Sequence, residues 1–488
     1  MRLSNLPLLS LAISAVSTLA AQCDPTLKEK PRVFIFTDIL NEPDDSQSLI
    51  RLLLHADELD IQGLVATTSY WLNTTNHPDE LRSVLETYGD VVDNLQLHAP
   101  GKYPSAEDLL SKVASGPTVY GSGGIGIGAG GGNISTGAAL FIDAVDSSSR
   151  SRPLWAKAWG GVNTLGEALY HIQSTRSASE LSEFISKVRV YTISDQDDVG
   201  TMIRRDFPQM QYICSIHGWN EYSMAAWIGI SDISIDVGGA DSSLVSPEWI
   251  KENVQLGPLG KLYPDTVYNM EGDTPSLLYS IPNGLSDPEH PEWGNWGGRY
   301  MPSDHTLKSA HYGDARDEVI GEDGKTYTSN HASVWRWRQA FQYEIAARIQ
   351  WQVKDRYEDA SHPPVVQVNA SCDLRPLEVD VKAGSVVFLD GSMSYDRNTN
   401  DSLPLTFDWW QYEEPTASQL SRLDAQKLEI TRPSDDVRNQ TAEVQIPLID
   451  SVCVSDSACQ DYHLILEVTG SGGMPMTRYK RVVLRTHP

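Results

Sequence analysis

Short apolar runs and longer amphipathic stretches alternate along residues 22–360. The amphipathic stretches, such as 81–88 and 165–172, have helical spacing. The apolar runs between them predict buried strands at 33–37, 61–67, 154–159, 188–193 and 211–216. This alternation predicts an α/β domain with a mostly parallel sheet and helices on both faces.

The pattern changes near residue 360, where a long helical pattern at 333–357 ends at a Ser-His-Pro-Pro stretch, 361–364. Seven short β-rich runs follow and predict an antiparallel sandwich with strands at 365–368, 377–381, 385–389, 405–409, 442–446, 463–468 and 481–484. Residues 390–396 and 407–409 resemble the polycystic-kidney-disease-type immunoglobulin-like repeat. We therefore expect an α/β domain over 22–360 and an immunoglobulin-like β-sandwich over 361–488.

The first 21 residues have the pattern of a secretory signal peptide. A positive start precedes an apolar stretch at 6–19 and the small residues Ala20 and Ala21. That stretch is too short to span a bilayer, and no later segment approaches 18 uninterrupted apolar residues. Asn-x-Ser/Thr sequons occur at Asn73, Asn133, Asn369, Asn400 and Asn439. We expect a secreted, soluble glycoprotein.

The net charge limits the kinds of binding partner, and the cysteines limit the possible disulfides. A net charge of -27 argues against nucleic acid and anionic membranes as partners, and favours the binding of cations. The chain does not reveal its oligomeric state. Among the five cysteines, Cys453 and Cys459 are close enough to close a small loop. Cys214 lies in an apolar run and is expected to be an inert core thiol.

Acidic and amide side chains gather where the first predicted strand ends: Asp38, Asn41, Glu42, Asp44 and Asp45. The carboxyl end of a parallel strand is where open α/β sheets bind ligands. Carboxylates this close repel one another unless a proton or a cation neutralises them. Their oxygen ligands suit calcium or magnesium better than zinc. The alternative is that Asp44 and Asp45 cap the following helix.

Two further strand ends carry candidate ligands. Gly160 and Gly161 form a tight turn before Asn163, and glycines there allow the backbone to approach a ligand. The alternative is an ordinary turn with Asn163 or Thr164 as helix cap. Asp195 begins an Asp-Gln-Asp-Asp group after the strand at 188–193, with helix capping again as the alternative.

Aromatic and polar loops later in the domain suit a sugar. The candidates are Trp219, Asn220 and Glu221 after the strand at 211–216, Glu271 and Asp273 before a helix-like run, and Trp293 and Trp296 in the Gly/Pro-rich segment 284–300. Flat aromatic faces stack on sugar rings while neighbouring polar groups bond the hydroxyls. The alternative is that the tryptophans belong to a packed structural loop.

The segment 121–132 contains a G-x-G-x-x-G match at 126–131. A stretch so rich in glycine meets this pattern by chance, and an exported protein has little access to NAD. We therefore expect a flexible loop over the site instead of a dinucleotide-binding turn.

Taken in order, these motifs resemble a known family. Asp38 with Asp44 and Asp45 resembles the N-terminal calcium motif of inosine–uridine-type nucleoside hydrolases, and the turn at 160–165 is similar to their second motif. More closely, the mature chain resembles secreted cellulose-binding proteins with a nucleoside-hydrolase-like domain and a C-terminal β-sandwich. The matching segments are 37–38, 41–45, 63–69, 159–164, 194–198, 271–275 and 335–337.

This resemblance implies a calcium-dependent glycosidase that acts on a carbohydrate outside the cell. Calcium would be bound by Asp38, Asp44, Asp45, Asp273 and the Asn163 carbonyl, with Asp38 as general base. The substrate-binding residues would be Asn41, Glu42, Asp195, Trp219, Asn220, Glu221, Glu271, Trp293 and Trp296. The loop after Asp38 is longer than in nucleoside hydrolases, and a nucleobase-handling histidine has candidates only in His305 and His311. The alternative is a non-catalytic protein that binds cellulose or another cell-wall glycan.

Overall fold

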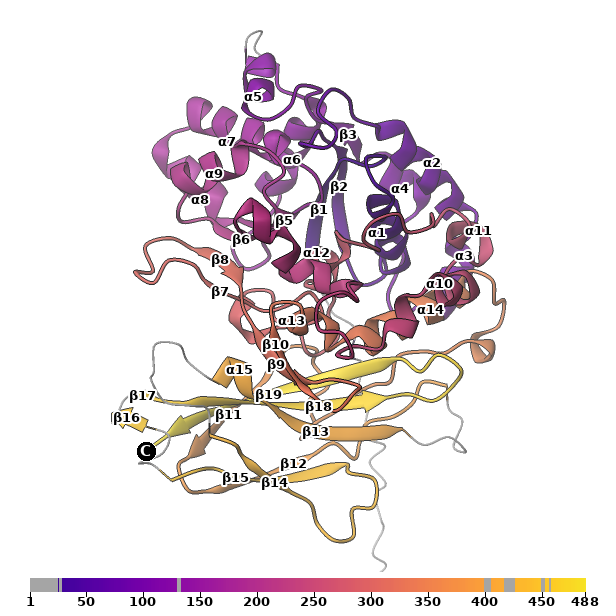
Figure 1. Ribbon diagram of the computed structural model, residues 1–488, viewed down its shortest axis with the longest axis vertical. Coiled ribbons are helices and arrows are strands. Elements are labelled where there is room, and N and C mark those ends of the chain that lie inside the picture. The colour runs from indigo at the N-terminus through magenta and orange to yellow at the C-terminus, as the bar shows by residue number, and fades with distance from the viewer. Residues whose placement is uncertain are drawn as a thin grey trace, which may run out of the picture.

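A computed structural model describes residue 25 and residues 29–129, 133–398, 405–416, 426–448, 453–455 and 458–488. The predicted signal peptide, 1–21, lies outside the described residues. Within those ranges, no helix is long and apolar enough to cross a membrane. The chain forms an α/β layer structure above a smaller β-rich region (Figure 1).

An eight-stranded sheet organises the first part of the chain, in the order β3-β2-β1-β4-β5-β6-β8-β7. Its strands are β1 (Arg32–Thr37), β2 (Asp60–Ala66), β3 (Val113–Ser115), β4 (Leu154–Ala158), β5 (Val188–Ser194), β6 (Gln211–Ser215), β7 (Tyr300–Pro302) and β8 (His311–Asp314). All neighbours pair in parallel except β7 and β8. The predicted α/β fold and its five strands are confirmed. The strands β3, β7 and β8 were not predicted, because three or four residues are too few to show a period.

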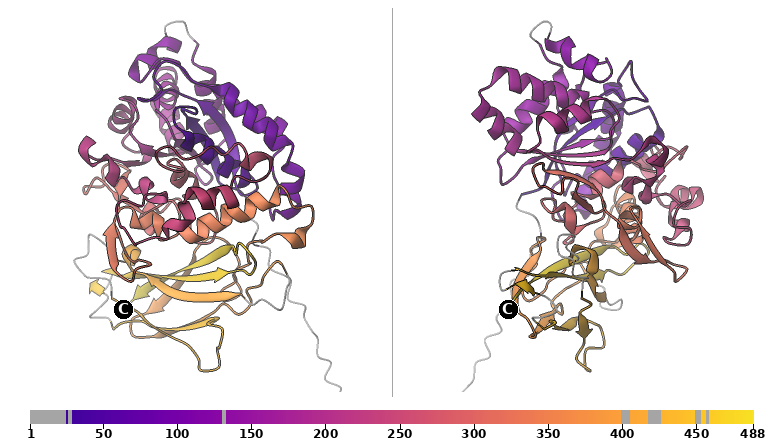
Figure 2. Two further views of the ribbon diagram at one scale, coloured as in Figure 1. Left: turned by 45° about the vertical axis from the view of Figure 1, so that its right-hand side comes forward. Right: turned by 60° about the vertical axis from the view of Figure 1, so that its left-hand side comes forward.

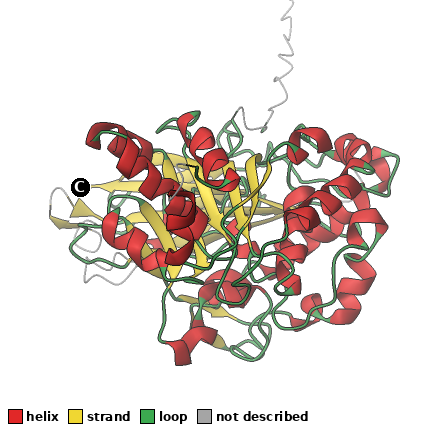
Figure 3. Ribbon diagram, turned by 90° about the horizontal axis from the view of Figure 1, so that it is seen from above, coloured by secondary structure: helices red, strands yellow, loops and turns green. Residues whose placement is uncertain are grey.

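Alternating side chains of the central strand bury the two faces of the sheet. Val33 and Ile35 point into one core, whereas Phe34 and Phe36 point into the other. The first core is covered by α1 (Pro43–Leu54), α2 (Pro78–Gly89), α3 (Val92–His98), α4 (Ala106–Leu110), α10 (Pro247–Asn253), α11 (Gly257–Gly260), α12 (Thr274–Leu278) and α14 (Arg338–Trp351). The second is covered by α6 (Thr136–Asp146), α7 (Asn163–Thr175), α8 (Ala178–Ser186) and α9 (Val199–Asp206). Figure 3 shows helices on both sides of the strands.

Two predicted segments differ from the structure. The helix expected at 333–357 is split into α13 (Ala332–Trp335) and α14, because Arg336 and Trp337 between them turn toward the β-rich region. The glycine-rich segment expected to be a flexible loop contains α5 (Ser122–Ala129), which packs on α7. Its first turn is fixed by the Asp198 carboxylate, which accepts from the Ser122 amide at 2.7 Å. Residues 130–132 lie outside the described residues.

The C-terminal region contains two packed sheets. One has the order β11-β19-β18-β13 and the other β12-β15-β14. The strands are β11 (Leu377–Lys382), β12 (Val386–Asp390), β13 (Thr406–Tyr412), β14 (Glu429–Thr431), β15 (Thr441–Gln445), β18 (Asp461–Thr469) and β19 (Thr477–His487). The pairing of β11 with β19 is parallel, so the predicted sandwich is mixed and not wholly antiparallel. The run at 365–368 forms only isolated bridges. A disulfide joins Cys453 to Cys459, as the sequence suggested, and Cys214 is a buried free thiol.

The two regions share a hydrophobic core. Tyr412, Ile465, Met476 and Tyr479 of the sandwich belong to the same buried cluster as α1 and α14. Figure 2 shows α14 lying across the sandwich strands. Arg478 of β19 extends from the sandwich to the α/β layers and forms ion pairs of 2.9 Å there. Removal of the sandwich would therefore expose part of the α/β core.

Candidate functional site

Four aspartates from three segments meet at the carboxyl end of β1. Asp38 follows β1, Asp44 and Asp45 lie in the first turn of α1, and Asp273 is the N-cap residue of α12. All four are buried, and Asp44, Asp45 and Asp273 offer carboxylate oxygens within 4.8 Å of one another. The helix α1 has Glu42 as its N-cap residue, with no side-chain cap bond. Asp44 and Asp45 thus occupy the first turn without being the cap residue.

Short hydroxyl side chains orient two of these carboxylates. The Ser69 hydroxyl donates to Asp38 Oδ2, and the Thr37 hydroxyl donates to Asp45 Oδ1. By contrast, Asp273 Oδ2 is buried and has no hydrogen-bond partner among the described residues. A buried carboxylate oxygen left in this state is costly unless a ligand meets it.

Burial raises the pKa of each carboxyl group in this cluster. The pKa of Asp38 is raised to about 6 and that of Asp44 to about 7. For Asp45 and Asp273, burial and then the charges of the neighbouring aspartates hold the pKa well above its usual range. The largest charge contributions at Asp273 come from the carboxylates of Asp45, Asp44 and Asp38. Such a cluster takes up protons or a cation before it can be stable.

The donor set fits calcium. Calcium–oxygen bonds are about 2.3–2.6 Å long, so oxygens within 4.8 Å of one another can share one ion. The unpartnered oxygen of Asp273 supplies a free donor. Magnesium has the same preference for oxygen but demands a shorter, near-octahedral shell that usually keeps several waters. A mostly carboxylate site therefore favours calcium.

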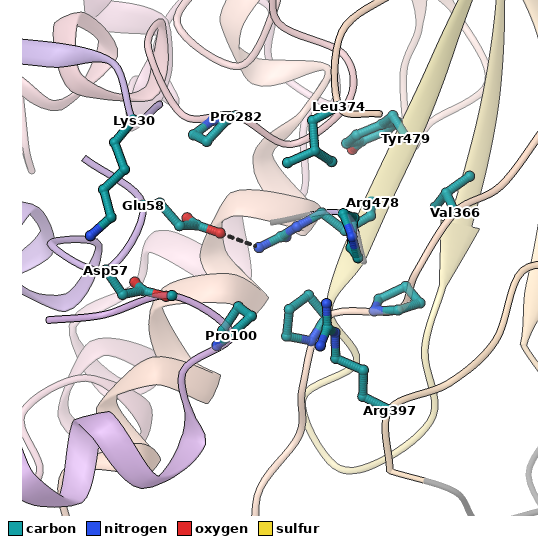
Figure 4. A pocket seen from close by; sticks show the side chains of 14 residues that line it. Lys30, Asp57, Glu58, Pro100, Pro282, Val366, Leu374, Arg397, Arg478 and Tyr479 are labelled. Atoms are coloured by element: carbon teal, nitrogen blue, oxygen red, sulfur yellow. Dashed lines mark hydrogen bonds and ion pairs between the residues drawn. The ribbon is translucent and has the colours of Figure 1, made fainter. Parts of the chain in front are cut away.

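A second buried acidic cluster is neutralised differently. His55, Glu58 and Glu344 are also close enough to share an ion. There, Arg348 lies 2.9 Å from Glu58 and 2.8 Å from Glu344, and Arg478 lies 2.9 Å from each. Figure 4 shows Glu58 paired with Arg478 among the side chains that line a cavity at the junction of the two regions. The volume of this cavity is about 70 Å³. In this second cluster, arginine side chains balance the negative charge of the glutamates, whereas the described residues around the aspartate cluster include no such ion pair.

The contacts of Glu271 fix the backbone just before Asp273. Its carboxylate pairs with Arg51, with distances of 2.5 and 3.0 Å, and accepts from the Tyr263 hydroxyl at 2.8 Å. Its backbone has a positive φ of 54°, and its amide donates to Gln47 Oε1. These bonds hold a strained residue two positions before Asp273. In this structure Arg51 occupies the Glu271 carboxylate inside the core, and the predicted sugar contact by Glu271 stays a prediction.

The turn after β4 lies against the cluster. A Cβ on Gly160 would sit 2.9 Å from Asp38 Cβ, and one on Gly161 would sit 2.5 Å from the Thr68 carbonyl oxygen. Glycine is therefore required for this close approach. The Asn163 side chain accepts from Thr67 at 2.7 Å and donates to Thr68 at 2.9 Å. Val162, not Asn163 or Thr164, is the N-cap residue of α7. The role of the Asn163 carbonyl as a ligand stays a prediction.

The acidic group after β5 contributes a different residue from the one predicted. Asp195 forms a two-bond ion pair with Arg204, at 2.8 and 2.6 Å, so its carboxylate is already occupied. Asp197 instead lies against the Gly161 turn, with Oδ2 buried and unpartnered among the described residues. Burial raises its pKa to about 7. The strand end was visible in the sequence, but the side chain that faces the site was not.

Polar residues form the rim. Asn41 and Glu42 are half-buried beside Asp38, and the Asn41 amide donates to the Asp38 carbonyl at 3.0 Å. Leu40, which lies between Asp38 and Asn41 in the sequence, has a backbone φ of 73°, in the left-handed region. Such strain at a ligand-binding edge is typical of functional sites. Glu42 adds its charge to those of the cluster.

An exposed aromatic cluster lies at the same edge of the sheet. Trp219 is 68% exposed, and Trp71 and Tyr70 are 45% and 56% exposed. The Trp219 ring centroid lies 6.0 Å from that of Trp71 and 6.1 Å from that of Tyr70. Asn220 and Glu221, next to Trp219, are exposed and bonded to each other at 2.9 Å. Tyr70 and Trp71 were not predicted, although an aromatic pair directly after a strand end was a signal.

The other two predicted stacking residues do not reach solvent. Trp296 is fully buried and its indole donates to the Tyr479 hydroxyl at 3.2 Å. Trp293 is 6% exposed and stacks on His290. Both rings pack at the junction with the sandwich, so the prediction that they stack on a sugar is wrong. The structural alternative holds for this segment.

Comparisons with known proteins agree with this geometry. The family model described as "Cellulose-binding Sde182, nucleoside hydrolase-like domain" matches residues 32–300, and "Cellulose-binding protein Sde0182, C-terminal domain" matches 386–486. The chain belongs to this cellulose-binding Sde182 family. Its fold is therefore that of a nucleoside-hydrolase-like α/β domain with a sheet-rich C-terminal region, as the sequence motifs suggested.

A solved structure supports the assignment over most of the chain. It is a nucleoside hydrolase-related protein from Saccharophagus degradans, described as associated with carbohydrate metabolism. The two share 30% identity and a TM-score of 0.76, over 94% of this chain and 100% of the other. The effector protein XOO4466 matches at 11% identity and a TM-score of 0.30, over 67% of this chain and 94% of its own, which adds no argument. Among curated protein sequences, none matches significantly.

Proposed function

We propose that this member of the family is a secreted, calcium-dependent glycosidase that hydrolyses a glycosyl bond of a carbohydrate. The observation that carries the proposal is the buried aspartate cluster, in which Asp273 Oδ2 has no hydrogen-bond partner among the described residues and lies among other carboxylates. A protein retains such an arrangement at a cost in stability, which ligand binding can offset. The position of the cluster at the carboxyl end of β1, where ligands commonly bind to α/β sheets, supports the proposal.

In this proposal, Asp38, Asp44, Asp45 and Asp273 hold the ion, together with the Asn163 carbonyl. Calcium, when bound, would polarise a water molecule and orient sugar hydroxyls. Asp38 would accept the proton of that water at Oδ1, because Oδ2 is already bonded to Ser69. Attack of the water oxygen on the anomeric carbon would break the glycosyl bond through an oxocarbenium-like state, which the surrounding carboxylates would stabilise. The leaving group would depart with a proton from solvent, and Asp38 would return to solvent the proton that it took from the water.

Sugar release tests this proposal. Purified protein is incubated with calcium or with EDTA and a panel of nucleosides, aryl glycosides and wall oligosaccharides. We expect calcium-dependent release by the wild type and a loss of at least about 100-fold in Asp38→Asn, the scale expected for a general base. Asp93→Asn, an exposed aspartate on α3, is the matched control and should keep full activity. Release by Asp38→Asn at the wild-type rate would exclude Asp38 as the base.

The rival is a non-catalytic glycan-binding protein. The family description "cellulose-binding" favours it, and the exposed aromatic rings fit it equally well. The aspartate cluster would then be a structural calcium site. If no substrate of the panel released sugar and the full chain was retained on insoluble cellulose, this rival would be favoured. Deletion of the sandwich would not separate the two functions, because the sandwich completes the α/β core.

A further inference from the structure

We infer that Tyr70, Trp71 and Trp219 form a glycan-binding platform continuous with the aspartate site, and that it binds a neutral β-1,4-linked glucan chain longer than one sugar. This inference rests on the proposed function for the class of ligand. The platform consists of these three rings throughout. The platform would bind sugar units of the ligand that do not contact the aspartate cluster.

The platform is tied to the aspartate site through the backbone after β2. The Ser69 hydroxyl donates to Asp38 and accepts from the Trp71 amide at 3.0 Å. The Tyr70 amide donates to the Gln196 carbonyl at 2.7 Å, which links this segment to the loop after β5. The platform is therefore anchored by the same serine that orients the proposed base.

A second connection runs through buried aromatic rings. A Cβ on Gly272 would lie 2.6 Å from Asp44 Oδ2 and 2.9 Å from the Trp227 ring, so carboxylate and indole flank this glycine. Tyr222 lies 5.9 Å from Trp227 and 5.5 Å from Trp219, measured between ring centroids. Two ring-to-ring steps thus separate the aspartates from the platform. The inferred ligand contacts both the aspartate site and the platform, and is therefore taken to be longer than one sugar.

The chemistry of the surface selects the ligand. Three rings that are 45–68% exposed contact one another and form an apolar patch, and the C–H faces of sugars stack on such rings. Trp71 and Trp219 stack on each other, 27° from parallel, and Tyr70 meets both rings edge-on. Asn220 and Glu221 supply polar groups at its edge. The net charge of -27 would repel an anionic polymer, so a neutral chain is favoured. The flat ribbon of a β-1,4-glucan meets these requirements.

Calorimetry on the full chain in EDTA tests this inference without turnover, with cellobiose and cellohexaose as probes. We expect cellohexaose to bind at least tenfold more tightly than cellobiose. Trp71→Ala and Trp219→Ala should each weaken cellohexaose binding by about tenfold. The matched control is Phe388→Ala, which removes a 50% exposed ring from β12 of the sandwich and should leave binding unchanged. Unchanged melting points would show that each variant is folded.

Several outcomes would overturn the inference. These are equal binding of both probes, equal binding by all variants, or a loss confined to Phe388→Ala. A wild-type dimer that dissociates in Trp219→Ala would also overturn it, because the platform would then bind a second copy. The two proposals fail separately. Absence of sugar release with tryptophan-dependent binding would reject the glycosidase and keep the platform, whereas release from cellohexaose with an unchanged KM in Trp219→Ala would do the reverse.

Discussion

Replacement of Asp273 by asparagine should stabilise the protein without calcium and destabilise it, relative to the wild type, with calcium. The reason is the repulsion within the cluster. Two unit charges at the 4.8 Å limit of the Asp44, Asp45 and Asp273 oxygens repel by about 3 kcal/mol at an effective dielectric constant near 20. Bound protons relieve part of this repulsion, because burial raises the pKa of Asp44 to about 7. At pH 8 we therefore expect Asp273→Asn to gain about 2–4 kcal/mol in EDTA.

Calcium should reverse the order of the two proteins. An ion at 100 times its Kd stabilises the wild type by about 2.7 kcal/mol, and the variant loses a charged ligand. Thermal unfolding at pH 8, in EDTA and in millimolar calcium, measures both effects as shifts of a few degrees in the apparent midpoint. Asp93→Asn is the control for the loss of one negative charge. The reasoning would be refuted if Asp273→Asn were no more stable than the wild type in EDTA and gained as much from calcium.

Three further changes test the surroundings of the site. Gly160→Ala places a methyl group 2.9 Å from Asp38 and should abolish the stabilisation of the protein by calcium. The control Gly473→Ala, whose methyl group has no atom within 4 Å, should keep it. Equal shifts of the unfolding midpoint by calcium in the two variants would contradict this. Arg51→Met leaves the Glu271 charge buried and should cost about 3–5 kcal/mol in chemical denaturation, and a cost below 1 kcal/mol would argue against the support role. Burial and the neighbouring His98 lower the pKa of His362 to about 4, so its contribution to stability is present above pH 6.5 and is lost as the pH falls toward 4. The free energy of unfolding of His362→Phe should therefore fall less than that of the wild type between pH 6.5 and 4. If both proteins lost the same stability over that range, this role of His362 would be excluded.

The strands, their order of appearance and the acidic strand end could be predicted because each is a local pattern. Five apolar runs became β1, β2, β4, β5 and β6 at nearly the predicted bounds. The sandwich was expected from its short β-rich runs, although the parallel pairing of β11 with β19 was not. The break between α13 and α14 could not be predicted, because Arg336 and Trp337 leave the helix for partners that lie far away in the sequence.

The sequence by itself determined the fold class and the gathering of Asp38, Asp44 and Asp45, since these depend on periodicity and on spacing within about ten residues. The family was indicated by the resemblance of its motifs. Only the tertiary structure decided which other polar and aromatic side chains join them. Asp197 faces the Gly161 turn because Arg204 takes Asp195. Trp296 is buried because the sandwich covers it, while Trp219 stays in solvent. A side chain's exposure depends on contacts between distant segments, and local pattern does not specify them.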